Sequence, residues 1–139
     1  QGMQYPAVSN VAENQTLSNP MYIHSISNNN DNQDIVSMGC NAAQMCARVI
    51  ENTFEVLSVH ALAIIQSITH LGYQDKLSPA TKWMYDELSA LAPAFTEDES
   101  SNERFLKIKN WLMETEVGDK MKALLGFDSW QLVEIPNHQ

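Results

Sequence analysis

The sequence has little positive charge, and its apolar residues are not gathered into one long run. Its 139 residues include 8 Lys or Arg against 17 Asp or Glu, a formal net charge of -9. A chain this acidic repels phosphate backbones, so nucleic acid is not expected as a partner. No uninterrupted apolar run reaches about 18 residues and no basic segment leads into an apolar one, so neither a membrane span nor a signal peptide is expected.

The short motifs that mark many active sites are missing as well. There is no Gly-rich phosphate loop, no HExxH and no G-x-S-x-G. The two cysteines, Cys40 and Cys46, are six residues apart on one expected helix. That spacing is too long for a disulfide and unsuited to sharing a metal, so we expect no metal site and two buried, reduced thiols. Reduced thiols favour a cytoplasmic location.

The strongest periodic pattern predicts one long helix over about residues 34–71. Nine apolar positions recur there at spacings of three and four residues: Ala43, Cys46, Ile50, Phe54, Leu57, Ala61, Ile64, Ile68 and Leu71. Such a helix has about 38 residues and is about 55 Å long, more than the diameter of a compact domain of this size. We therefore expect an all-α fold whose long central helix is covered partly by helices from another chain or from sequence beyond these residues.

Shorter helices are expected to pack back on the long one. The first runs from Pro6 to about Leu17, and the stretch from Met21 to Ile26 is expected to be extended or irregular. The chain is interpreted as one segment in three parts. Residues 1–33 hold a helix and an Asn-rich loop, residues 34–126 the helical region, and residues 127–139 a tail without a clear period.

Residues that favour helix starts or helix ends predict the bounds of the later helices. Gly72 suits the end of the long helix, and Ser78 with Pro79 suits the start of the next. Ser100 with Glu103 matches a capping box for a further helix. A last short helix, from Asp119 to Leu125, should stop at Gly126.

An Asn-rich segment, from Asn28 to Gln33, is the cluster that most suggests a binding site. Side-chain amides offer donors and acceptors while staying neutral. At the N-terminus of the long helix they would suit a zwitterion, because amide N–H groups meet its carboxylate, amide carbonyls meet its ammonium, and the helix dipole favours the negative group. The alternative is an Asn-rich turn, since Asn favours turns for local backbone reasons.

The segment from Asn32 to Gly39, NQDIVSMG, resembles the one that opens the long C-terminal helix of the aromatic amino acid ammonia-lyases, the histidine, phenylalanine and tyrosine ammonia-lyase family. The flanks are similar to bacterial tyrosine ammonia-lyases in particular: AENQTLSNP from Ala12, MYIHS from Met21, VIEN from Val49 and FEVL from Phe54. The similarity extends from Gly2 to about Lys109, and the tail after Glu116 matches nothing in the family pattern.

The resemblance implies a homotetramer of long helices that eliminates ammonia from an aromatic amino acid to give an aryl acrylic acid. It implies a methylidene-imidazolone (MIO) electrophile, formed from an internal Ala-Ser-Gly, and a catalytic tyrosine on an N-terminal loop. This sequence begins at Gln1 and contains neither Ala-Ser-Gly nor that loop. We therefore expect the C-terminal portion of a lyase, with no catalytic residue of its own and no activity as an isolated chain.

Four positions carry the substrate-site resemblance. Gln33 stands where histidine ammonia-lyases carry Glu and phenylalanine and tyrosine lyases carry Gln, and Asn32 precedes it as in the latter. Ile35 stands where histidine lyases often have His. Asn29 matches a carboxylate that approaches the substrate amine in plant phenylalanine lyases, although here it is an amide. The resemblance therefore predicts Gln33, Asn32 and Asn29 as substrate-binding residues for tyrosine or phenylalanine.

Two alternatives stay open from the sequence. One is a histidine ammonia-lyase or an aminomutase on the same scaffold. The other is a non-catalytic helical oligomerisation domain, which an Ala-Ser-Gly in the reading frame upstream of Gln1 would exclude.

Overall fold

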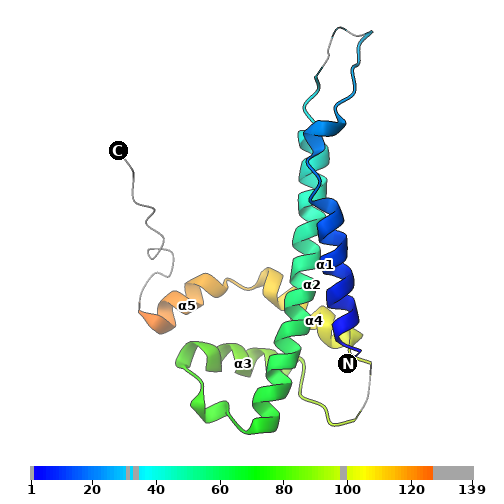
Figure 1. Ribbon diagram of the computed structural model, residues 1–139. Coiled ribbons are helices and arrows are strands. Elements are labelled where there is room, and N and C mark those ends of the chain that lie inside the picture. The colour runs from blue at the N-terminus through cyan, green and yellow to red at the C-terminus, as the bar shows by residue number, and fades with distance from the viewer. Residues whose placement is uncertain (1, 31, 33–34, 98–99, 127–139) are drawn as a thin grey trace, which may run out of the picture. The chain divides into compact units, whose positions relative to one another are not determined.

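A computed structural model describes residues 2–30, 32, 35–97 and 100–126 (Figure 1). Within these ranges the regular structure is entirely helical. The elements are α1 (Gln4–Leu17), η1 (Met21–His24), α2 (Gly39–Leu71), η2 (Gln74–Lys76), α3 (Pro79–Leu91), α4 (Asn102–Glu114) and α5 (Val117–Leu125), where η marks a 3-10 helix. The predicted all-α fold is confirmed. By its internal contacts the chain divides into two compact units, Gln1–Val59 and His60–Gln139, with α2 running through both.

In unit 1, α1 lies along the N-terminal half of α2 (Figure 1). The first helix is confirmed, and the expectation of an irregular stretch from Met21 to Ile26 was wrong for residues 21–24, which form η1. Pro20 precedes η1 with an extended backbone, and the Ile23 amide bonds the Pro20 carbonyl at 3.4 Å. Proline pre-sets the φ angle for such a tight turn, which explains the short helix.

The long helix begins at Gly39 rather than at about residue 34, so the predicted start was too early. The first helical hydrogen bond runs from the Ala42 amide to the Met38 carbonyl at 2.9 Å. Ahead of it, the Val36 amide donates to the Ser25 hydroxyl at 2.7 Å. Residues 35–38 are not helical, in keeping with the preference of β-branched Ile35 and Val36 for extended backbone.

Unit 2 holds the apolar core of the described chain. Its buried side chains are Leu62 and Ile65 from α2, Ala80 and Leu88 from α3, Ala92, and Ile108 from α4. The rings of Trp83 and Trp111 lie 5.7 Å apart between centroids. The Gln66 amide donates to the Phe95 carbonyl at 2.6 Å and accepts from the Phe95 amide at 3.1 Å, which fixes the connection after α3 to α2.

Most of the residues predicted to start or end helices do so in the structure. Gly72 and Gly126 have φ of 66° and 72°, in the left-handed region that glycine adopts without strain. Ser78 caps α3 by accepting from the Thr81 amide. The capping box was wrong: α4 begins after Ser101 without a side-chain cap, because Glu103 pairs with Lys107 at 2.8 Å instead of turning back to the chain end.

The apolar stripe that defines α2 in the sequence is not the face that this chain buries. The buried α2 residues are Asn52, Ser58, Leu62 and Ile65. Every seventh residue of the stripe is about half-exposed: Ile50 49%, Leu57 43%, Ile64 52% and Leu71 57%. Helix α2 also contains an 18-residue window with a mean hydropathy of 1.3, of which 17% is buried. By length and composition alone that window could cross a membrane, and the core helix of a soluble protein passes the same test. The sequence analysis did not expect such a window, because polar residues interrupt its apolar residues.

Candidate functional site

The described part of the Asn-rich segment, residues 28–30 and 32, lies at the far end of the connection between η1 and α2, which we call the hairpin (Figure 1). The Ser25 hydroxyl joins the legs through the Val36 amide at 2.7 Å. At the tip, Asn29 and Asn30 have left-handed φ angles of 53° and 57°, and the Asn32 amide bonds the Asn29 carbonyl at 3.2 Å. Asparagine tolerates this backbone better than most residues, which explains why the sequence turns here.

The structure brings two of the three predicted site residues together. Asn29 and Asn32 share the turn, and both are exposed. Gln33 lies outside the described residues. The expectation that the amides sit at the helix N-terminus was wrong, because α2 begins only at Gly39 and the extra residues form the hairpin. The electrostatic effect of a helix dipole extends only about one turn beyond the helix end. The positive end of α2 therefore does not attract a negative group bound at this tip.

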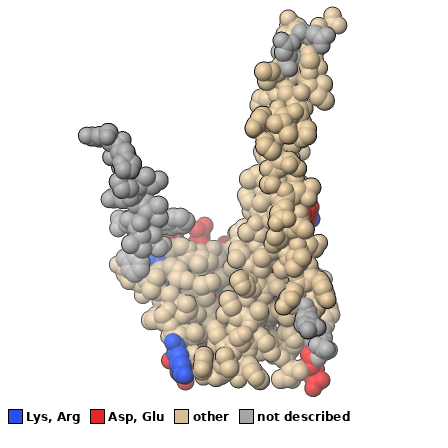
Figure 2. All heavy atoms as spheres, in the orientation of Figure 1, with Lys and Arg blue, Asp and Glu red and all other residues tan. Residues whose placement is uncertain are grey.

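Asp31 and Asp34 of the Asn-rich stretch lie outside the described residues, and the rest of the sequence around the hairpin carries no charged side chain. Between Glu13 and Arg48 the described residues include no Lys, Arg, Asp or Glu. On the face in view, Figure 2 shows this stretch as a continuous surface without charged side chains over η1 and the first turns of α2. The described amides are neutral donors and acceptors that can hold a polar ligand, and they supply neither a general base nor a nucleophile.

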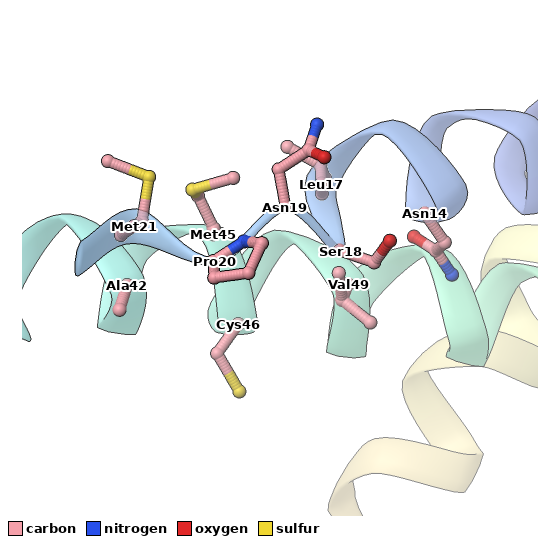
Figure 3. A pocket seen from close by; sticks show the side chains of 10 residues that line it. All are labelled: Asn14, Leu17, Ser18, Asn19, Pro20, Met21, Ala42, Met45, Cys46 and Val49. Atoms are coloured by element: carbon pink, nitrogen blue, oxygen red, sulfur yellow. The ribbon is translucent and has the colours of Figure 1, made fainter. Parts of the chain in front are cut away.

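An apolar pocket of about 350 Å³ lies where the chain leaves α1 and crosses the start of α2 (Figure 3). It is lined from α1 and its exit by Leu17 and Pro20, and from η1 and α2 by Met21, Met45 and Cys46. None of the amides at the hairpin tip lines it. The pocket therefore belongs to the helix junction that carries the hairpin and not to the amide cluster itself.

A polar network, which the sequence gave no reason to expect, joins α1 to α2. The Arg48 guanidinium donates to both oxygens of the Glu13 carboxylate, Nε to Oε1 at 3.0 Å and Nη2 to Oε2 at 3.1 Å. The Asn52 side chain is fully buried, and its Nδ2 donates to Glu13 Oε2 at 3.0 Å and to Asn14 Oδ1 at 2.9 Å. Near by, Asn10 Nδ2 donates to Glu55 Oε2 at 2.8 Å. Glu13 and Arg48 are 35 positions apart, and no local pattern in the sequence pairs them.

The hydrogen bond from Arg48, followed by the one from Asn52, holds the pKa of the Glu13 carboxyl below its ordinary value. Arg48 and Glu13 are both about half-exposed, so the ion pair by itself adds little stability. Its two-pronged geometry and the buried Asn52 instead fix how α1 lies on α2.

The described residues contain no group of His, Cys, Asp or Glu able to hold a metal ion. Cys40 and Cys46 are free but exposed, so the expectation of buried thiols was wrong. They lie on the first turns of α2, where α1 and η1 cover one side of the helix and leave the rest accessible (Figure 1).

Fold and site together define a helical segment that presents uncharged amides on a hairpin ahead of a long helix. A family model described as aromatic amino acid lyase matches residues 1–90. The chain is 42% identical over 97 residues to the MIO-dependent tyrosine 2,3-aminomutase of Streptomyces globisporus, covering 70% of this chain and 18% of that protein. It is 41% identical over 96 residues to a histidine ammonia-lyase of Staphylococcus aureus, covering 69% of this chain and 19% of that protein.

Solved structures agree with these matches. The crystal structure of tyrosine aminomutase from Streptomyces globisporus gives a TM-score of 0.82 at 35% identity, covering 88% of this chain and 23% of that one. A mutant tyrosine aminomutase gives 0.83 at 34% identity, covering 91% and 24%. The chain belongs to the aromatic amino acid lyase family. It spans about a fifth of the length of the curated relatives it matches.

The network around Glu13 predicts a pH dependence of the α1–α2 junction. The pKa of Glu13 is lower in the folded chain than its ordinary value of 4.5. The charged Glu13 carboxylate therefore stabilises the junction above pH 4.5, and this stabilisation is lost as the pH falls through the pKa of the folded chain. Hydrogen exchange of the α1 amides should therefore accelerate below that ordinary value in the wild type, when compared at each pH with Glu13→Gln so that intrinsic exchange rates cancel.

The matched control is Glu103→Gln, which removes the exposed pair with Lys107 on α4 and should leave α1 exchange at the wild-type rate. Exchange in α1 that keeps a constant ratio between wild type and Glu13→Gln at every pH would contradict the role of this carboxylate.

Proposed function

We propose that this chain is the C-terminal segment of a longer ammonia-lyase that converts tyrosine or phenylalanine to the corresponding aryl acrylic acid. The observation that carries the proposal is the turn that Asn29 and Asn32 share, in a chain of this family. Asn29, Asn32 and Gln33 bind the substrate, with amide N–H groups toward its carboxylate and amide carbonyls toward its ammonium. The chemical step is carried out by residues elsewhere in the complete enzyme.

The choice of a carbocyclic ring rests on Gln33 and Ile35. An imidazole substrate can use a carboxylate or a histidine partner, whereas a phenyl ring cannot, and this chain has a neutral amide and a branched aliphatic side chain at these two positions. A tyrosine 2,3-aminomutase and histidine ammonia-lyases are both among the relatives, so the scaffold alone does not select the substrate.

A second candidate is an aminomutase, in which the amino group returns to the neighbouring carbon. The structural similarity to tyrosine aminomutase, over most of this chain, favours this alternative specifically. The product distinguishes the two, since a mutase yields a β-amino acid in place of a free aryl acrylate.

The cofactor proposed for the complete enzyme is the MIO group named for the tyrosine aminomutase relative. That group is formed from Ala-Ser-Gly, which these 139 residues do not contain, so they supply no atom of it. When bound it provides the electrophile. The part played by this segment is limited to holding the substrate and excluding solvent.

The half-exposed stripe on α2 supports an oligomeric assembly. Ile50, Leu57, Ile64 and Leu71 recur every seven residues, the spacing that packs a helix against partner helices. We propose that helices of a homotetramer cover this stripe in the cytoplasm, and that neither lipid nor nucleic acid is a partner. The family membership supports a helical partner over a membrane.

The activity is tested on the complete polypeptide with tyrosine, phenylalanine and histidine side by side. We expect ultraviolet absorbance of coumarate or cinnamate to appear with the first two substrates. Urocanate formation from histidine as the main activity would overturn the substrate assignment, and a β-amino acid product would favour the aminomutase.

The role of Gln33 is tested in the same enzyme. Gln33→Ala should lower kcat/KM for the aromatic substrate by about 10-fold, roughly the loss of one or two substrate hydrogen bonds. Gln33→Glu should raise activity on histidine relative to tyrosine, because a carboxylate can pair with an imidazole. Gln15→Ala, the same change on the exposed face of α1, is the control. Wild-type kinetics in both Gln33 variants would remove this residue from the site.

The assembly is tested on the 139-residue segment alone, which should self-associate and show no lyase activity. Sedimentation velocity should give a species larger than a monomer, and the double variant Leu57→Gln, Ile64→Gln should shift it toward the monomer. Ala63→Gln, an exposed position on another face of α2, should not. A clean monomer of the unaltered segment would contradict the proposed interface.

A further inference from the structure

The two legs of the amide hairpin are tied together at their base by one side chain. The Ser25 hydroxyl oxygen accepts a hydrogen bond from the Val36 amide at 2.7 Å, across eleven positions of sequence. Both residues are half-buried, while Asn28, Asn29, Asn30 and Asn32 beyond them are exposed. The bond therefore marks the boundary between the anchored base of the hairpin and its amide-bearing tip.

Ser25 is itself held firmly on the η1 side. It is the residue that ends η1, and its amide bonds the Tyr22 carbonyl at 3.3 Å. Its backbone is extended, with φ of -60° and ψ of 131°. The hydroxyl is thus presented from a closed turn, next to the point where the chain crosses the start of α2.

Val36 is equally close to fixed structure on the α2 side. Two residues later, the Met38 carbonyl accepts the first hydrogen bond of α2 from Ala42. The Ser25–Val36 bond therefore links the end of η1 to the beginning of α2. Without it, the loop loses a link between η1 and α2, and a loop with fewer cross-links samples more conformations.

We propose that Ser25 is a positioning residue for substrate binding: its hydroxyl closes the base of the hairpin and so fixes where the tip amides lie. This inference rests on the proposed function of the hairpin. Ser25 contacts no substrate in this role and acts through Val36 and the placement of Asn29 and Asn32.

The test uses the complete enzyme with Ser25→Ala and Ser25→Thr. Ser25→Ala should raise KM for the aromatic amino acid and Ki for cinnamate or coumarate by about 3- to 10-fold, the factor that one net hydrogen bond corresponds to. The turnover number per active site should change by less than about twofold, because the chemical groups lie elsewhere. Ser25→Thr keeps the hydroxyl on a backbone that suits a β-branched residue and should restore both constants.

A merely structural role predicts a different result, with fewer active molecules and a lower Tm but unchanged KM and Ki. Ser89→Ala is the matched control, since its hydroxyl bonds only the Asp86 carbonyl within α3 among the contacts described for it, and KM should stay at the wild-type value. Hydrogen exchange supplies a second readout: the Val36 amide should be protected in the wild type and Ser25→Thr and lose protection in Ser25→Ala.

Asn32→Ala separates this inference from the proposed function. If Asn32→Ala raises KM and Ser25→Ala leaves KM and Ki unchanged, the positioning role is overturned and the substrate-binding hairpin stands. If Asn32→Ala has no effect on either constant, the proposed function fails, and the positioning role fails with it whatever Ser25→Ala does.

Discussion

The burial of helix α2 is the constraint on which the rest of the structure depends. At about 1.5 Å per residue its 33 residues extend about 50 Å, and the described chain buries four of them. Two of those four, Asn52 and Ser58, are polar, so unit 1 has a hydrogen-bonded junction where a core would be expected. The apolar stripe with the seven-residue recurrence stays accessible. A helix with this division of surfaces is stable as one layer of a larger bundle, and this explains why so much of its sequence pattern has no partner within the chain.

The elements governed by local chemistry could be predicted from the sequence. Ser78 and Pro79 start a helix because the cap and the fixed φ act within a few residues, and Gly72 and Gly126 end helices because they alone adopt the left-handed backbone without strain. The start of α2 could not be predicted in this way. The residues ahead of it, 35–38, are not helical, and the periodic pattern of α2 does not show where the helix starts.

The candidate site shows the same division. The amide cluster was visible in the sequence because four asparagines in the five positions 28–32 are unusual, and the left-handed angles at Asn29 and Asn30 confirm that a turn forms there. The separation between the amide cluster and the N-terminus of α2 could not be predicted, because an irregular loop and a hairpin have the same residue composition. The Glu13–Arg48–Asn52 network was missed for a related reason: spacings of 35 and 39 residues match no local rule.

The left-handed turn at Asn29 and Asn30 has a consequence for how this surface can vary among descendants of the protein. Glycine would keep the backbone but erase the amide, and glutamine would keep the amide but resist the backbone. Under the substrate-binding role proposed for Asn29, asparagine alone meets both demands with a short side chain, so backbone shape and chemistry together restrict variation at this position. At Asn30 the backbone alone imposes the restriction, and glycine would satisfy it.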